Sequence, residues 1–193
     1  MSTSLLHTLQ SKGFFTYGKI LPGLTIYGKP APYPVLNERA VRAGAGIMFV
    51  IGFFSFMQAL YSGVYEYLAF TVLFFFVDFV MKVIIGTRFS PISIVANWVV
   101  RKQTPEYIGA IQKRFAWSLG LVLSGTMVLL VWVFEIRGPI NLSICLLCLT
   151  FMFLETSFGI CVGCKIYNFL LHKGIIATPE YKPACPGNAC AIE

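Results

Sequence analysis

Four long apolar runs dominate the pattern of hydrophobic and polar positions along this chain. They cover approximately residues 40–61, 66–85, 115–134 and 140–158. Each run is close to the ~20 apolar residues that a helix needs to cross the hydrocarbon core of a bilayer. The link at 62–65 is too short for anything but an antiparallel turn, so the first two runs form a hairpin. The pattern therefore predicts an all-α fold, an integral membrane four-helix bundle.

A shorter apolar segment lies within the long loop at 86–114, between the second and third runs. Residues 92–100 are too few to cross a membrane, and Trp98 near the end of this segment is typical of the membrane–water interface. The segment predicts an interfacial amphipathic helix between spans two and three. Asn37 is the predicted N-cap of the first span, and Glu38 lies in the first turn of that helix.

The regions outside the spans have a different character. Residues 1–36 are predicted to form a cytosolic or interfacial arm, and the proline-rich run at 29–34 is predicted to be an extended strut. Residues 37–173 form the predicted four-span membrane domain, and 174–193 a flexible tail that contains cysteines. No apolar segment with a small-residue cleavage site occurs in the first thirty residues, so we expect insertion to start from the first span.

The composition agrees with a membrane protein. Hydrophobic residues make up 57% of the 193 residues and charged residues only 12%, against roughly a quarter charged in soluble domains. The net charge of +7 does not indicate nucleic acid as a partner, because the cations flank apolar runs and form no basic stripe.

The cations also predict an orientation. Of the 15 lysines and arginines, only Arg137 lies on the side of the bundle opposite to the termini and the long loop. Since cytoplasmic loops carry the excess of positive charge, we expect both termini and the long loop in the cytosol. The expected location is the cell inner (cytoplasmic) membrane, crossed several times.

The six cysteines form three pairs, Cys145/Cys148, Cys161/Cys164 and Cys185/Cys190. The first pair lies within span four, where buried cysteine behaves as a small hydrophobe, so we interpret it as packing. Cys148 and Cys161 are thirteen residues apart, roughly 20 Å along a continuous helix. The first two pairs therefore cannot form one metal site unless the helix folds back.

Cys161 and Cys164 lie in a setting that favours chemistry. Gly159 and Gly163 can interrupt the helix and leave Cys161 near the start of a new helical piece, where free backbone N–H groups favour a thiolate. Lys165 adds positive charge. The pattern predicts a reactive dithiol with Cys161 as the attacking thiolate and Cys164 as the resolving thiol. A soft-metal site and a pair of reduced cysteines at a helix end are the alternatives.

Two acidic residues lie within apolar runs, where a carboxylate usually marks function or pairing. Asp78 has a partner one helical turn away, Lys82. Glu155 has no local partner and precedes Cys161 by six residues, so it is a candidate catalytic group that accepts protons for the thiol pair. The alternative for Glu155 is a structural ion pair with one of two arginines near the same boundary, Arg88 or Arg114.

A metal site is the alternative interpretation of the cysteines. Four of them can share one side of the membrane, namely Cys161, Cys164, Cys185 and Cys190. Four thiolates suit zinc or an iron–sulfur cluster. We favour thiol chemistry because the proline and glycine residues around the last pair leave it poorly preorganised.

Three motifs resemble those of a known family: Arg88-Phe-Ser-Pro91, Arg114-Phe115 and Phe158-Gly-Ile-Cys-Val-Gly-Cys164. The chain resembles an uncharacterised family, a domain of unknown function found in small four-helix bacterial membrane proteins, over roughly 37–171. The resemblance implies a four-helix membrane domain with the CxxC pair as its hallmark, and it supplies no activity.

Our hypothesis for function is thiol redox chemistry or sulfur transfer by Cys161 and Cys164 at the cytosolic face. The alternatives are a non-enzymatic accessory or scaffold subunit of a larger membrane complex, and a transporter of a soft metal or sulfur species. Expected partners are the lipid bilayer and either a thioredoxin-like or sulfurtransferase protein or a larger complex. The sequence leaves open whether the chain is an enzyme.

Overall fold

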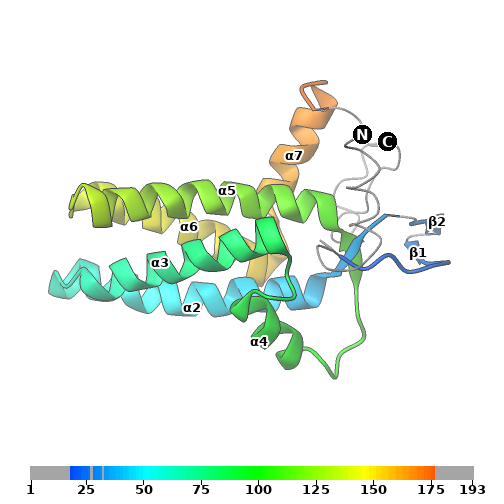
Figure 1. Ribbon diagram of the computed structural model, residues 1–193, viewed down its shortest axis with the longest axis horizontal. Helices are drawn as coiled ribbons and strands as arrows, with labels where there is room; N and C mark the ends of the chain where they lie inside the picture. Colours follow the sequence, from blue (N-terminus) through cyan, green and yellow to red (C-terminus); the bar gives the residue numbers. More distant parts are fainter. Residues whose placement is uncertain (1–17, 27, 32, 177–193) are drawn as a thin grey trace.

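The computed structural model describes residues 18–26, 28–31 and 33–176, and within these ranges it is a bundle of long helices (Figure 1). The long helices are α2 (Glu38–Ser62), α3 (Glu66–Val80) with the π-helical turn η1 (Met81–Ile85), α5 (Ala110–Val128) with the π-helical turn η2 (Leu129–Val133), and α6 (Pro139–Phe158). All four units are long and apolar enough to cross a membrane. The predicted all-α membrane bundle is confirmed.

Two shorter helices, α4 (Pro91–Val99) and α7 (Val162–His172), lie at one end of the bundle. The helix α4 confirms the short amphipathic helix expected in the long loop. Figure 1 shows α7 running transverse to the four long helices. The third spanning helix begins at Ala110, five residues before the predicted start at 115, because Gln112 and Lys113 are buried rather than part of a loop.

Two small antiparallel sheets lie at the same end and were not predicted. The strands β1 (Thr25–Ile26) and β2 (Lys29–Pro30) form a hairpin, which includes the start of the expected strut. The strand β3 (Val35–Asn37) pairs with β4 (Tyr107–Gly109), so the segment before α2 is joined to the segment before α5. We call this the sheet end of the bundle. Asn37 is the N-cap of α2, as expected, and its side chain accepts a hydrogen bond from the Arg39 N–H.

Small residues let the helices approach each other closely. A Cβ atom on Gly52 in α2 would lie 3.1 Å from the Leu149 side chain of α6 and 3.4 Å from the ring of Phe75 in α3. A Cβ atom on Gly44 would lie 3.4 Å from Ile92 in α4. Without a hydrophobic driving force between helices in lipid, such close packing is a main source of association.

A buried carboxylate, Asp78, ties α4 to α3. Asp78 is 0% exposed, and its Oδ2 atom lies 2.6 Å from the Nζ atom of Lys82. Its Oδ1 atom accepts hydrogen bonds from the Ser90 hydroxyl at 2.7 Å and from the Ile92 N–H at 3.1 Å. The predicted Asp78–Lys82 pair is confirmed.

The serine of the Arg88-Phe-Ser-Pro91 motif has two roles in this network. Ser90 is the N-cap of α4, where its Oγ atom accepts a hydrogen bond from the Ser93 N–H at 3.1 Å. Pro91 occupies the first turn of α4, where a missing N–H costs nothing. The motif therefore begins α4 and at the same time satisfies the buried carboxylate of Asp78.

We predict that Asp78→Asn destabilises the protein by about 3–5 kcal/mol, because Lys82 then keeps a buried charge without its counter-charge. Thermal unfolding of the detergent-solubilised protein measures this. Glu66→Gln, at an exposed acid in the first turn of α3, is the control and leaves the midpoint almost unchanged. Asp78→Asn combined with Lys82→Met recovers part of the loss. Equal midpoints for Asp78→Asn and Glu66→Gln would contradict the assignment.

Candidate functional site

The site begins where α6 ends, at Gly159. This residue has φ 68° in the left-handed region, which glycine adopts without strain, and its N–H donates to the Glu155 carbonyl at 3.1 Å. The Ile160 N–H donates to the Leu154 carbonyl at 3.0 Å. The guanidinium of Arg42 in α2 donates to the Thr156 carbonyl at 3.1 Å, and its positive charge is favourable at a helix C-terminus.

Cys161 is the N-cap of the next helix, α7. Its Sγ atom accepts a hydrogen bond from the Cys164 N–H at 3.2 Å. The two cysteines form a disulfide, with Cα atoms 5.2 Å apart, which is within the usual range for this bond. The predicted helix interruption before Cys161 is confirmed.

Gly163, between the two cysteines, has a different role from the predicted one. It lies inside α7 and does not interrupt the helix. A Cβ atom there would lie 2.6 Å from the Ala116 Cβ and 2.7 Å from its Cα, so glycine is what allows α7 to contact α5. The ring of Tyr167 lies 5.5 Å from that of Phe115 and extends the same contact. Burial raises the pKa of Tyr167 above its usual value.

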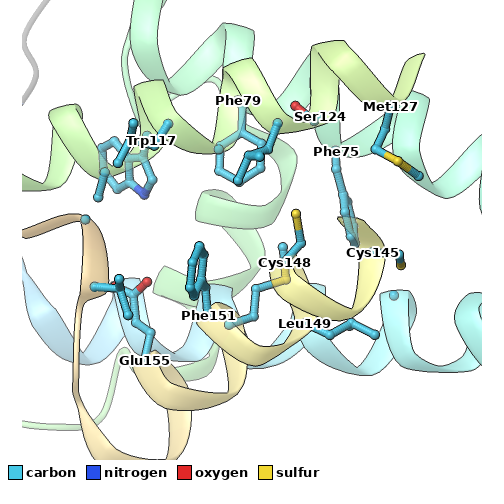
Figure 2. Close-up of a pocket in the computed structure, with 18 of the residues that line it drawn as sticks. Phe75, Phe79, Trp117, Ser124, Met127, Cys145, Cys148, Leu149, Phe151 and Glu155 are labelled. Carbon is cyan, nitrogen blue, oxygen red and sulfur yellow. The ribbon is translucent and has the colours of Figure 1, made fainter. Parts of the chain in front are cut away.

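An apolar cavity of about 140 Å³ lies next to the disulfide (Figure 2). Its lining comes from all four spans and from α7, and includes Cys161. Figure 2 shows Phe151 and Cys148 of α6 facing Phe79 and Trp117 across the cavity. The walls are mostly aromatic and aliphatic, and Glu155 is the charged side chain that lines it.

Glu155 forms an ion pair with Lys113 of α5, a partner that the sequence analysis did not name. The Lys113 Nζ atom lies 2.5 Å from Glu155 Oε1. The lysine side chain is 1% exposed and the glutamate side chain 20% exposed. The position of Lys113 near the start of the third span could have marked it as a candidate for an ion pair. Its partner Glu155, forty-two residues away, could not have been identified from the sequence.

A second cleft of about 760 Å³, which we call the polar cleft because its lining is more polar than that of the apolar cavity, lies at the sheet end between α2, α4 and the strand β3. Its lining includes the cations Lys19, Lys82 and Arg88. Four side chains line both the cleft and the apolar cavity, namely Phe79, Trp117, Met152 and Glu155. Glu155 therefore lies at the boundary between a polar space and an apolar one.

The other predicted cysteines separate into two groups. Cys145 and Cys148 are free thiols, and Cys145 belongs to a buried hydrophobic cluster, in agreement with packing. Because the helix turns at Gly159, Cys148 and Cys161 line the same cavity despite their distance along the chain. Cys185 and Cys190 lie outside the described residues. Among residues 18–26, 28–31 and 33–176, no group of three or more His, Cys, Asp or Glu is placed to hold a metal ion.

Comparison with known families identifies one that matches most of this chain. The family described as Domain of unknown function (DUF4395) matches residues 36–172. This range contains the four spans, α4, α7 and the Cys161–Cys164 pair. No curated protein matches the chain, and no solved structure does.

We predict that Gly163→Ala lowers stability by about 1–3 kcal/mol, because the added methyl overlaps Ala116 and α7 must move away from α5. Thermal unfolding measures the loss. After reduction, maleimide labelling of Cys161 is faster than in the unmodified protein. Lys165→Ala, on the exposed face of α7, is the control. Combining Gly163→Ala with Ala116→Gly restores part of the stability, whereas no rescue would contradict the contact.

Proposed function

The chain belongs to the DUF4395 family, and we propose that it is a membrane-embedded thiol–disulfide protein in which Cys161 and Cys164 cycle between a disulfide and a dithiol. The family description assigns no activity, so the proposal is based on the site. The observation that carries it is the disulfide at the first turn of α7, with Cys161 as the N-cap. Two cysteines that serve only for packing would not require the helix to end at Gly159 or a cysteine sulfur to cap the next helix.

The position of each sulfur supports a division of roles. In the dithiol, the N-terminus of α7 and the Cys164 N–H stabilise a thiolate at Cys161. Cys161 is therefore our nucleophile, and Cys164 the resolving thiol that closes the ring. Oxidation removes two electrons and two protons from the pair as the S–S bond forms. Reduction returns both electrons and both protons.

Glu155 is our candidate for the proton acceptor. It lines the cavity that contains Cys161, and its ion pair with Lys113 holds its carboxyl group at the edge of that cavity. The polar cleft on its other side offers a route for that proton to water. In this proposal Glu155 is a proton carrier and Lys113 is the residue that positions it.

We place the sheet end in the cytosol of the bacterial inner membrane. Most cations of the described chain lie at that end, among them Arg39, Arg42, Arg88, Lys113 and Lys165, whereas Arg137 lies at the opposite end. The distribution follows the rule that cytoplasmic segments retain positive charge.

The proposed cycling predicts a reversible change in free thiols. Purified protein treated with dithiothreitol and then diamide should gain and lose two reactive thiols, counted by mass spectrometry after labelling with maleimide in denaturant. Cys161→Ser abolishes the change, because Cys164, the remaining thiol of the pair, then has no partner. The control Cys145→Ser/Cys148→Ser keeps it, since these residues are free thiols that pack in the bundle. A pair that never re-forms its disulfide under diamide would leave a scaffold as the better interpretation.

The proposed orientation predicts which loops face the outside. In a Cys185→Ser/Cys190→Ser background, Ser62→Cys at the α2–α3 hairpin reacts with an impermeant maleimide on intact spheroplasts. Thr104→Cys, in the long loop, reacts only after the membrane is permeabilised. Both positions are exposed, so accessibility within the protein is matched. The reverse pattern would move the disulfide to the other side of the membrane.

A further inference from the structure

We propose that the apolar cavity beside Cys161 binds the ring of a lipid-soluble quinone, which accepts two electrons and two protons from the Cys161–Cys164 dithiol. The inference depends on the thiol cycling proposed above and adds the identity of the electron acceptor. Four observations carry it: the burial of the disulfide, the size and walls of the cavity, its position toward the lipid, and the placement of Glu155.

The disulfide is closed off from large partners. Cys161 is 5% exposed and Cys164 is 2% exposed. Thiol–disulfide exchange requires direct attack on a sulfur atom, so a thiol on another folded protein has no approach to this pair in the described structure. Cys161, however, lines the cavity. A small molecule inside the cavity can therefore contact Cys161, which a partner protein at the surface cannot reach.

The cavity fits one six-membered ring. Its volume of about 140 Å³ is close to that of an engineered protein cavity of about 150 Å³ that stays dry and binds benzene. Aromatic side chains from three helices enclose it: Phe75 and Phe79 from α3, Trp117 from α5 and Phe151 from α6 (Figure 2). Such walls stack on a flat apolar ring and offer few competing polar groups.

The cavity reaches toward the lipid between α5 and α6. Leu119 and Leu123 of α5 and Phe151 of α6 line it and are only half-buried. Both helices are apolar enough to span the membrane, so their outer surfaces contact acyl chains. A ring entering between them stays in an apolar medium throughout, and its isoprenoid tail remains among the lipids. This favours a membrane-dissolved oxidant over a water-soluble one.

The atoms and electrons of the step balance. Two S–H bonds break and one S–S bond forms between Cys161 and Cys164. The two electrons and two protons reduce the quinone to the hydroquinone, in which each carbonyl oxygen becomes a hydroxyl. Glu155 lines the same cavity, accepts the Cys161 proton and passes it to a quinone oxygen. The overall reaction needs no further reactant.

The test uses the full chain, reduced with dithiothreitol, freed of reductant and held in detergent micelles with a short-chain benzoquinone. We expect one quinone reduced per chain, followed by its ultraviolet absorbance, and none with Cys161→Ser. Cys148→Phe fills the cavity and slows quinone reduction at least about tenfold, while oxidation by diamide still closes the disulfide. Leu146→Phe, which adds the same ring on the exposed outer face of α6 and away from the cavity, behaves as the unmodified protein.

Each result decides between the two proposals. Cycling with diamide but no quinone reduction overturns the quinone and leaves the thiol function intact. No cycling with either oxidant overturns both. Quinone reduction by Cys148→Phe at the unmodified rate overturns the cavity as the site. If Cys148→Phe fails to fold, photo-crosslinking of an azidoquinone to the unmodified protein replaces it. Labels on cavity-lining residues of α3, α5, α6 or α7 support the site, and labels only outside the cavity lining refute it.

Discussion

A single buried carboxylate, Asp78, determines how the sheet end of this bundle is built. An ionised group in the interior of a membrane bundle persists only with a counter-charge and hydrogen bonds. Lys82 provides the charge, and Ser90 and the Ile92 N–H provide the hydrogen bonds. Satisfying Asp78 therefore fixes the start of α4 against α3. The helix α4 then packs on Gly44 of α2, and the polar cleft lies beside it.

The same lysine links this network to the site. The Lys82 ammonium lies 5.5 Å from the centre of the Phe79 ring and 5.9 Å from that of Trp117, and both rings also line the apolar cavity. On the other side, the left-handed turn at Gly159 and the close approach of Gly163 to Ala116 place α7 against α5. Two independent features thus shape the walls of the cavity. One is the charged Lys82 side chain beside Phe79 and Trp117, and the other is the pair of glycines, Gly159 and Gly163, that lets α7 pack on α5.

Much of the architecture followed from local sequence. The four spans and α4 are visible in hydropathy, because each is a continuous segment that must satisfy its own backbone in lipid. The break at Gly159 and the Asp78–Lys82 pair are also local. The pairing of β3 with β4 was not predictable, since three-residue strands about seventy residues apart carry no periodic signal. The Lys113–Glu155 ion pair and the contact that explains Gly163 depend on how α5 meets α6 and α7, which spacing along the chain does not reveal.

The burial of the Cys161–Cys164 disulfide has a consequence for its contact with reductants in solution. Glutathione and similar aqueous reductants set the state of an accessible pair according to the compartment. A pair with almost no contact with water equilibrates with that pool slowly, so its oxidation state is kinetically insulated from it. Under the proposed thiol cycling, the oxidation state of such a pair follows events within the bilayer rather than the thiol balance outside it.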